Sequence, residues 1–316
     1  MVQLKKRQSQ HEWLSKQVQR ILDMTNNMLK IDSEQYNDYE LEYGFWSVKK
    51  ELALAYLVRP FCQIAKRYFK AFYYLDLFAG SGMMKADSQT FFAGSPIVVL
   101  GSTPPETKFA AYHCCEIRKE RHEALQNRVK IAAQVFGMPT PSLYNCDCNA
   151  KIDDLLTTLC PKGARNTCFL AFIDPEGLEI DWNTVQTLLH HCRGDLLFTF
   201  STMGVIRNIG KSDSNALNRF FGDEKWKKLD TSRADIIVDY YKLKLEEADR
   251  RVFSFPVIDE YNHRLYDMIL ATGSSGMANA IRDLTTRLNA VKTKDISNMA
   301  DVLTGKTMQL GTFPSG

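Results

Sequence analysis

Residues 72–82 read Phe-Tyr-Tyr-Leu-Asp-Leu-Phe-Ala-Gly-Ser-Gly, and their character changes within this short stretch. The first half is apolar and aromatic, which is typical of a β-strand buried on both faces. The second half contains Gly80 and Gly82, and glycine reaches positive φ and lets the backbone approach a ligand closely. The stretch therefore predicts a buried strand that ends in a tight turn, as in a parallel sheet covered by helices.

Four more apolar runs follow, separated by segments with helical spacing. The runs are Lys108–Arg118, Pro141–Ala150, Thr167–Gly177 and Gly194–Thr202. The predicted helices between and after them are Lys119–Val135, Ala150–Leu159 and Asp181–His191. Apolar strands that alternate with helices favour a parallel sheet with helices on both faces, which is the doubly wound, Rossmann-like α/β architecture.

Further elements are predicted on either side of this pattern. The runs Arg251–Ile258 and Leu265–Thr272 are joined by the short polar segment Asp259–His263, which suits an antiparallel hairpin better than a crossover helix. Apolar residues recur at helical spacing within residues 11–31 and 46–68, so we expect two helices before the first strand. Five parallel strands and the hairpin give a predicted sheet of seven strands.

The order of these elements predicts the domain organisation. We expect residues 1–70 to form an N-terminal helical segment that packs on the core. Residues 71–290 form the expected α/β domain, with a helical insert at about 205–250 after the fifth strand. Residues 291–316 are expected to form a C-terminal tail.

Composition excludes some classes of protein and leaves others open. The chain has 316 residues, with 40 Lys and Arg against 37 Asp and Glu, so its formal net charge is only +3. Charge alone therefore does not indicate nucleic-acid binding, although a local basic face is compatible with it. The eight cysteines lie mostly in apolar runs without a Cys-x-x-Cys pair, so no metal site is predicted. The polar opening residues lack the apolar stretch of a secretory signal, and no run suits a membrane helix, so we expect a cytoplasmic protein with reduced cysteines.

Acidic residues end the first four predicted strands, at Asp76, Glu116, Asp147 and Asp174. The carboxyl ends of parallel strands meet at one edge of the sheet, where ligands bind at the switch of strand order. Each acid taken singly is explained as a solvated loop carboxylate or a helix N-cap. Four of them beside a glycine turn repel one another unless a polar ligand uses them, so the sequence predicts a ligand site at this edge.

The turn at residues 76–82 resembles the acid-x-x-x-Gly-x-Gly loop of class I S-adenosylmethionine-dependent methyltransferases. The resemblance implies that S-adenosylmethionine is the cofactor and that the following residues bind it: Asp76, Phe78, Gly80, Ser81 and Gly82. It also implies that Glu116 holds the ribose and that Asp147 contacts the adenine. A nicotinamide-binding Rossmann enzyme fits less well, because Lys85 stands where a third glycine or alanine is expected.

The fourth strand ends in Asp174-Pro175-Glu176-Gly177, which resembles the Asp/Asn-Pro-Pro-aromatic tetrad of amino-directed nucleic-acid methyltransferases. The closer match is the Asp-Pro-Phe-Gly version of tRNA guanine-N2 methyltransferases. The resemblance implies catalytic roles for Asp174, Pro175 and Gly177, in which the acid and the proline carbonyl accept hydrogen bonds from a base amine and orient its lone pair. Glu176 replaces the aromatic residue that would stack on a flipped base. An ordinary Asp-Pro turn is the alternative interpretation.

A narrower resemblance is to the three-Cys-motif partner proteins, a bacterial and phage family of methyltransferase-like proteins. It rests on Tyr74–Gly80, on Gly94–Pro96 at the start of a helix, and on Phe172–Leu178 followed by Trp182. The resemblance implies a partner protein, of radical type, that bears three cysteines. It does not supply a biochemical activity.

Two functions from different classes follow from these resemblances. The first is an S-adenosylmethionine-dependent N-methyltransferase that acts on a base amine of RNA or DNA. The second is a non-catalytic partner with a methyltransferase fold, which binds cofactor or nucleic acid and assists a three-Cys-motif metalloenzyme. Methylation of a protein or small molecule stays open as a third. Basic and aromatic residues in the insert, including Lys242, Lys244 and Tyr240, indicate either a nucleic-acid-binding face or a solvated amphipathic helix.

Overall fold

A seven-stranded sheet forms the centre of the computed structural model, which describes residues 9–31, 43–161, 166–191, 193–209 and 215–306. Its strands are β1 (Ala71–Asp76), β4 (Ala111–Cys115), β5 (Ser142–Tyr144), β6 (Thr167–Ile173), β7 (Arg193–Phe200), β8 (Arg251–Ile258) and β9 (Arg264–Thr272). Their order across the sheet is β5-β4-β1-β6-β7-β9-β8. The first five in the chain are parallel, and β9 is antiparallel to β7 and β8. The predicted doubly wound sheet of seven strands with its antiparallel hairpin is confirmed.

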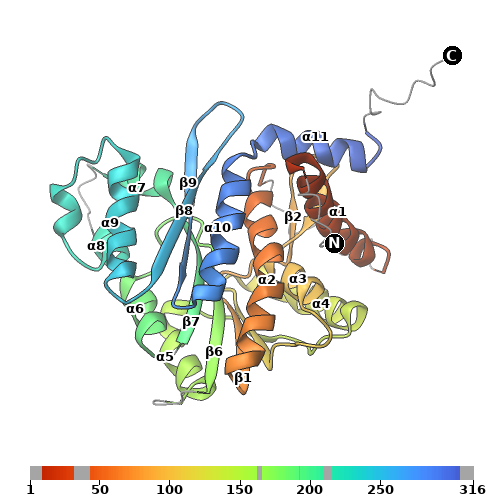
Figure 1. Ribbon diagram of the computed structural model, residues 1–316, viewed down its shortest axis with the longest axis horizontal. Coiled ribbons are helices and arrows are strands. Elements are labelled where there is room, and N and C mark those ends of the chain that lie inside the picture. The colour runs from red at the N-terminus through yellow and green to blue at the C-terminus, as the bar shows by residue number, and fades with distance from the viewer. Residues whose placement is uncertain (1–8, 32–42, 162–165, 192, 210–214, 307–316) are drawn as a thin grey trace, which may run out of the picture.

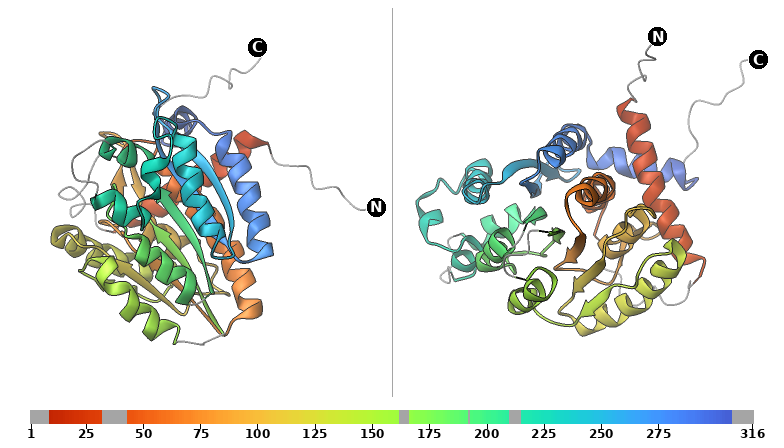
Figure 2. Two further views of the ribbon diagram at one scale, coloured as in Figure 1. Left: turned by 90° about the vertical axis from the view of Figure 1, so that its left-hand side faces the viewer. Right: turned by 60° about the horizontal axis from the view of Figure 1, so that its bottom comes forward.

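Helices cover both faces of this sheet (Figures 1 and 2). One face carries α2 (Val48–Tyr68), α3 (Ser95–Ser102) and α10 (Ser275–Asn289), and α4 (Lys119–Phe136) packs beside α3. The opposite face carries α5 (Cys148–Leu159), α6 (Trp182–His191) and α9 (Ala234–Glu246). Side chains of β1 alternate between the two layers: Tyr74 packs with the first set and Leu75 with the second, and both are fully buried. Burial on both faces explains why this strand lacks a polar alternation before Asp76.

The helices outside the main layers also belong to the core. Helix α1 (Gln10–Leu29) begins in a capping box, in which Ser9 and Glu12 each accept a hydrogen bond from the other's backbone N–H. Its buried face packs with that of α11 (Thr293–Leu303), and both join the cluster that includes α2 (Figure 2). The expected tail therefore begins with a helix whose residues Ile296 and Met299 are buried in the core.

Some elements are additional to those predicted. A two-stranded antiparallel sheet of β2 (Met83–Lys85) and β3 (Phe91–Ala93) separates the glycine turn from α3. Helix α10 also is absent from the predictions, although Met277, Ile281, Leu284 and Leu288 are its buried residues at helical spacing. The insert after β7 consists of α7 (Thr202–Asn208), α8 (Asn215–Phe221), the short 3₁₀ helix η1 (Lys225–Lys228) and α9. Residues 210–214 of this insert lie outside the described residues.

The winding of the chain defines a switch point. From β1 the chain moves outward through β4 to β5, then returns to place β6 on the other side of β1. In such a sheet the loops that follow β1 and β6 diverge, and they leave a crevice outside the carboxyl ends of the strands. The glycine turn and residues 174–177 follow β1 and β6, so both predicted motifs lie at this point.

Candidate functional site

The pairing register brings three of the four strand-end acids to one edge. Asp76, the last residue of β1, pairs with Cys114 on one side and with Phe172 on the other. Glu116 and Asp174 each follow two residues after those partners. The predicted convergence of Asp76, Glu116 and Asp174 at the carboxyl edge therefore matches the register of the sheet.

Asp147 lies farther out than the other three acids. It follows β5 by three residues and is the N-cap of α5, where its Oδ1 accepts a hydrogen bond from the backbone N–H of Asn149 at 2.9 Å. Its side chain is exposed. This is the capping role that the sequence offered as an alternative, and a contact with adenine stays a prediction.

The glycine turn is closely packed at Gly82 and open at Gly80. Gly80 and Gly82 have φ of 61° and 82°, a conformation that side chains disfavour. A Cβ at Gly82 would lie 3.0 Å from Leu125, and a Cβ at Gly94 would lie 3.0 Å from the carbonyl carbon of Gly82. A Cβ at Gly80 would meet nothing within 4 Å. The turn is thus fixed against α3 and α4, and the space beside Gly80 is free for a ligand.

The other two predicted residues of the turn differ in burial. Ser81 is buried, its hydroxyl donates to the Met83 carbonyl at 3.2 Å, and its own carbonyl accepts a hydrogen bond from Arg128 at 2.8 Å. Phe78 is half-buried and packs against the cluster on the α5 and α6 face. These contacts shape the turn, and they leave a role of Ser81 or Phe78 in cofactor binding as a prediction.

Asp76 is a fully buried acid with an unused acceptor. Its Oδ2 accepts a hydrogen bond from the Tyr74 hydroxyl at 3.0 Å, whereas Oδ1 is buried without a hydrogen-bond partner among the described residues. Burial raises the pKa of Asp76 to about 7, and the hydroxyls of Ser95 and Tyr74 act in the opposite direction. A ligand ammonium or hydroxyl that donates to Oδ1 would satisfy this oxygen, so the residue fits the polar end of a cofactor.

Glu116 is buried at the end of β4, with 6% of its surface exposed. Its Oε1 accepts a hydrogen bond from the Arg118 backbone N–H at 2.7 Å, and its backbone N–H donates to the Tyr144 carbonyl at 3.0 Å. Asn145 donates to the Glu116 carbonyl at 2.8 Å. The first of these bonds holds the carboxylate, and the other two hold the backbone of Glu116. A carboxylate held at the end of this strand suits a vicinal diol such as ribose.

Asp174 forms an ion pair that the sequence did not predict. Its Oδ2 lies 2.6 Å from the Nζ of Lys50, and both side chains are more than four-fifths buried. The Lys50 ammonium also lies 5.5 Å from the ring centroid of Tyr266, whose hydroxyl donates to the Trp46 carbonyl. Asp174 Oδ1 is buried without a hydrogen-bond partner among the described residues. One oxygen of Asp174 is therefore held by the protein, and the other is free to accept.

The next residue of α2 adds a second buried acid. Glu51 is 2% exposed, and burial raises its pKa well above the ordinary value, with Asp174 and Asp76 acting in the same direction and Lys50 against them. Its Oε2 is buried without a hydrogen-bond partner among the described residues. Neither Glu51 nor the pairing of Lys50 with Asp174 was predicted, although three consecutive charged residues, Lys49–Glu51, directly before the apolar run Leu52–Ala55 are a usable signal.

Glu176 and Gly177 complete the tetrad in different ways. The Glu176 carboxylate forms ion pairs with Arg118 at 2.8 Å and with Arg121 at 2.5 Å. The Gly177 backbone N–H donates to the Glu179 carboxylate at 2.6 Å, so it is already engaged. Pro175 is buried. The residue in the position of the missing aromatic therefore joins the loop after β6 to the start of α4.

Tyr43 brings an aromatic side chain to this edge. Burial raises the pKa of Tyr43 to about 12; among the charges that act on it, Arg121 lowers the pKa, and Glu176 and Asp174 raise it. Its backbone N–H donates to the Lys85 carbonyl in β2 at 2.8 Å, which ties the segment before α2 to the hairpin after the glycine turn. Sequence reasoning did not find Tyr43, because nothing in its local pattern marks it.

The basic residues of the insert are mostly engaged by the protein itself. Lys244 forms an ion pair with Asp223 at 2.6 Å and lies 4.3 Å from the ring centroid of Trp182. Lys242 pairs with Asp239 at 2.9 Å, and Tyr241 is fully buried among aromatic rings. A cavity of about 410 Å³ lies between α6 and α9 beside Lys244. These contacts favour the amphipathic helix over a continuous basic face.

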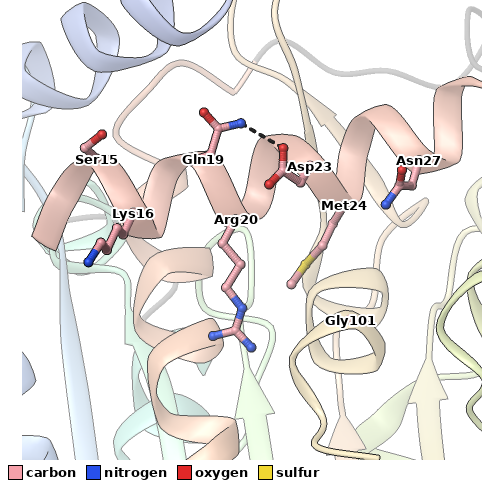
Figure 3. Close-up of a pocket in the computed structure, with 8 residues that line it drawn as sticks. All are labelled: Ser15, Lys16, Gln19, Arg20, Asp23, Met24, Asn27 and Gly101. Carbon is pink, nitrogen blue, oxygen red and sulfur yellow. Dashed lines mark hydrogen bonds between the residues drawn. The ribbon is translucent and has the colours of Figure 1, made fainter. Parts of the chain in front are cut away.

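A second cavity of about 410 Å³ lies along α1, and its lining residues include none of the strand-edge acids (Figure 3). Gln19 donates to Asp23 at 2.7 Å across its surface. Arg20 donates to the carbonyls of Ala55 and Ser102, and it thereby joins α1 to α2 and to the end of α3. These side chains serve helix packing, so the cavity is not part of the site at the sheet edge.

Other chemistry is not indicated by the described residues. Among them no group of three or more His, Cys, Asp and Glu is placed to hold a metal ion, and their seven cysteines are free. Within the same ranges no helix is both long and apolar enough to cross a membrane. Cys192 lies outside the described residues.

The sequence matches no protein-family model and no curated protein. Similar solved structures include a putative O-methyltransferase from Klebsiella pneumoniae, with 11% identity, 82% of this chain and 90% of that chain covered, and a TM-score of 0.44. The O-methyltransferase TomG from Streptomyces achromogenes, in complex with S-adenosylmethionine, has 13% identity, 86% and 93% coverage, and a TM-score of 0.40. An O-methyltransferase from Bacillus cereus, in complex with S-adenosylhomocysteine, has 7% identity, 86% and 94% coverage, and a TM-score of 0.42. The fold of this chain is established by its own strand order.

Proposed function

We propose that this protein is an S-adenosylmethionine-dependent methyltransferase that modifies an exocyclic amine of a nucleic-acid base. The observation that carries the proposal is the unpartnered, buried carboxylate oxygen of Asp174. Asp174 lies at the switch point beside the glycine turn, with one oxygen held by Lys50 and the other buried and unpartnered. A buried acceptor without a donor is costly, so this position favours a ligand that donates a hydrogen bond.

The residues present at the edge fit the proposed cofactor. Asp76 offers a buried, unpartnered oxygen to an ammonium or hydroxyl donor, and Glu116 offers a fixed carboxylate to a diol. The open space beside Gly80 admits a ligand close to the main chain. S-adenosylmethionine, when bound, supplies an activated methyl group.

The role of Asp174 is to orient the substrate. An amine N–H that donates to Asp174 Oδ1 would have its lone pair directed away from the carboxylate, and the Pro175 carbonyl is the second acceptor that the tetrad resemblance implies. Lys50 prevents rotation of the carboxylate, because it holds Oδ2 at 2.6 Å. Orientation of this kind accelerates a transfer without a strong base.

Calorimetry and a transfer assay test the two halves of the proposal separately. We expect the wild type to bind S-adenosylmethionine in calorimetry and Glu116→Ala to lose that binding. We expect Asp174→Ala to keep the cofactor but to lower methyl transfer into total RNA or DNA on the order of 100-fold, because the amine is no longer oriented. Asp174→Asn retains an acceptor oxygen and should retain part of the activity.

Nucleoside mass spectrometry on the treated nucleic acids identifies the modified base and atom. Asp154→Asn is the matched control, because Asp154 is an exposed acid on α5 whose side chain is 79% exposed. Equal transfer by wild type and Asp174→Ala would contradict the role of Asp174. Absence of cofactor binding by the wild type would contradict the proposal as a whole.

The ion pairs of Glu176 favour a second candidate function, a non-catalytic partner. Glu176 offers no aromatic face to a base, and its carboxylate is bound to Arg118 and Arg121. Such a protein would bind cofactor or nucleic acid and assist a three-Cys-motif protein. Co-purification of that partner, together with no methyl transfer to any nucleic-acid pool, is the outcome that would select this function.

A further inference from the structure

We propose that Arg118 and Arg121 form a binding site for a backbone phosphate of the nucleic-acid substrate, and that Glu176 occupies this site until the substrate binds. The inference rests on the proposed function, because it adds a substrate contact to the same strand edge. It gives Glu176 a role that the tetrad resemblance does not.

The two arginines converge on one anion. Arg118 Nη2 lies 2.8 Å from Glu176 Oε2, and Arg121 Nη1 lies 2.5 Å from Glu176 Oε1, so each carboxylate oxygen is held by a different guanidinium. Paired guanidinium groups match the oxygens of a phosphate as well as those of a carboxylate. The geometry is therefore that of a site for a two-oxygen anion, and Glu176 is its internal occupant.

Arg121 has capacity beyond this pair. Its side chain is only 12% exposed, and its Nη2 is buried without a hydrogen-bond partner among the described residues. A carboxylate held at Nη1 leaves this donor unused. A phosphate presents more acceptor oxygens than a carboxylate does, and it can engage this donor as well.

The internal pair is weak enough to be exchanged. Arg118 and Glu176 are 54% and 43% exposed, and an ion pair with this much contact with water adds little to stability. Arg118 is the N-cap of α4 and Arg121 lies in its first turn, so the positive end of the helix adds to the attraction for an anion. A phosphate that displaces Glu176 therefore breaks only weak ion pairs and contacts both arginines and the positive end of α4.

The position of the pair connects it with the site. Arg118 follows β4 and Glu176 follows β6, and β1 lies between these two strands. The ion pairs consequently span the carboxyl end of β1, where the cofactor and the amine are proposed to meet. Glu176 is two residues from Asp174, so the proposed phosphate site lies beside the amine acceptor.

Fluorescence anisotropy with a labelled single strand tests the exchange. The probes are RNA and DNA single strands of mixed sequence and about 16 nucleotides. We expect Glu176→Gln, which keeps the size of the side chain and removes its charge, to bind them about three- to tenfold more tightly than wild type. We expect Arg118→Ala/Arg121→Ala to weaken binding at least tenfold, and to reduce the slope of log affinity against log salt by about 0.7 for each phosphate lost.

Asp235→Asn is the matched control. It also raises the net charge by one and releases an exposed arginine, Arg233, from an ion pair of 2.6 Å, but it lies in the insert. An equal gain in this control would overturn the proposal, because the effect would then reflect net charge alone. The same conclusion would follow if the Glu176→Gln gain survived when both arginines were also replaced by alanine.

A parallel titration with S-adenosylhomocysteine and the methyl-transfer assay separate the remaining outcomes. Tighter binding of that ligand by Glu176→Gln, with unchanged affinity for the strands, would assign the arginines to a cofactor carboxylate and overturn the phosphate site. If the wild type transfers methyl groups but all variants bind the RNA and DNA probes with unchanged affinity, this inference is overturned and the proposed function stands. Tighter strand binding by Glu176→Gln without any methyl transfer would support the phosphate site and contradict the function.

Discussion

Asp76 shows how the packing of a single residue changes the chemistry that its sequence position suggests. The carboxylate was predicted at the strand edge from the apolar run that precedes it. Its pKa of about 7 arises from complete burial, and burial is a property of α2, α3 and the sheet together. The local sequence predicts the position of Asp76 in the chain but not the pKa of its carboxyl group.

Asp76→Asn is expected to change the pH dependence of stability. Burial raises the pKa of Asp76 in the folded protein to about 7, from 3.8 for an ordinary aspartate. Between these values unfolding releases a proton, so stability falls as the pH rises. The asparagine variant lacks this fall, and relative to wild type it should gain up to about 1.4 kcal/mol for each pH unit across the window. Urea unfolding at pH 4.5 and 7.5 measures the difference.

Asp154→Asn, at an exposed acid, serves as the control for that measurement and should follow the wild type. Parallel pH profiles of wild type and Asp76→Asn would show that Asp76 is ionised at neutral pH in the folded protein, contrary to this expectation.

The ion pair of Lys50 with Asp174 could not be predicted from local sequence patterns. Lys50 lies 124 positions before Asp174 in the chain, and no spacing rule relates two residues so far apart. Arg121 and Glu176 are separated by 55 positions in the same way. The strand-end acids were predictable because each apolar run in the sequence ends visibly at an acid. The residues that pair with these acids belong to other elements, which reach the edge only in the folded protein.

The glycine turn and helix α3 work as one unit at the scale of the element. Between them the chain forms the β2–β3 hairpin, so Gly94 returns to Gly82, and its N–H donates to the Gly82 carbonyl at 2.8 Å. The sequence predicted the turn and the start of the helix at Gly94. It did not predict the hairpin, because strands of three residues are too short to show a period of two.

Gly94→Ala is expected to destabilise this unit. The new Cβ would lie 3.0 Å from the Gly82 carbonyl carbon and 3.1 Å from its oxygen, and backbone atoms cannot move aside without shifting the turn. We expect a loss of about 1–3 kcal/mol in the free energy of unfolding, together with weaker binding of S-adenosylmethionine. Urea unfolding and calorimetry measure the two effects.

Gly273→Ala is the control for that substitution, because its Cβ would meet only Arg250 at 3.7 Å. It should leave the stability within about 0.5 kcal/mol of wild type. If Gly94→Ala were equally mild, the contact between the turn and α3 would not be the feature that fixes the loop.

At the scale of the whole molecule, the N-terminal and C-terminal helices share one core. Helices α1, α2, α10 and α11 belong to a single buried cluster with one face of the sheet. The division into segments 1–70, 71–290 and 291–316 follows the chain, whereas the hydrophobic core does not divide at those boundaries. We therefore expect the described helices and sheet to unfold together.

Ile296→Ala tests this expectation. Ile296 lies on α11 and is fully buried, so the substitution removes apolar contacts from the shared core. We expect a loss of about 2–5 kcal/mol from a single cooperative unfolding transition, observed by circular dichroism and tryptophan fluorescence. Asn298→Ala, at an exposed position on the same helix, should have little effect.

The alternative result for Ile296→Ala is a separate, low-stability transition. Unfolding of α11 before the sheet, with the main transition unchanged, would show that residues 293–303 are a peripheral element.

Local patterns in the sequence were enough to predict the class of fold, and they indicated the sheet edge at which we propose the site. Local hydrophobic periodicity is enough to predict the strands and the helices, and their alternation along the chain favours parallel strands. The burial and pairing of the acids at that edge, in contrast, depend on tertiary contacts. The tertiary structure buried Asp76 and Glu51, paired Asp174 with Lys50, and joined Glu176 to two arginines. The physical reason is that desolvation and ion pairing act between elements far apart in the chain, and their strength depends on distances that no local pattern contains.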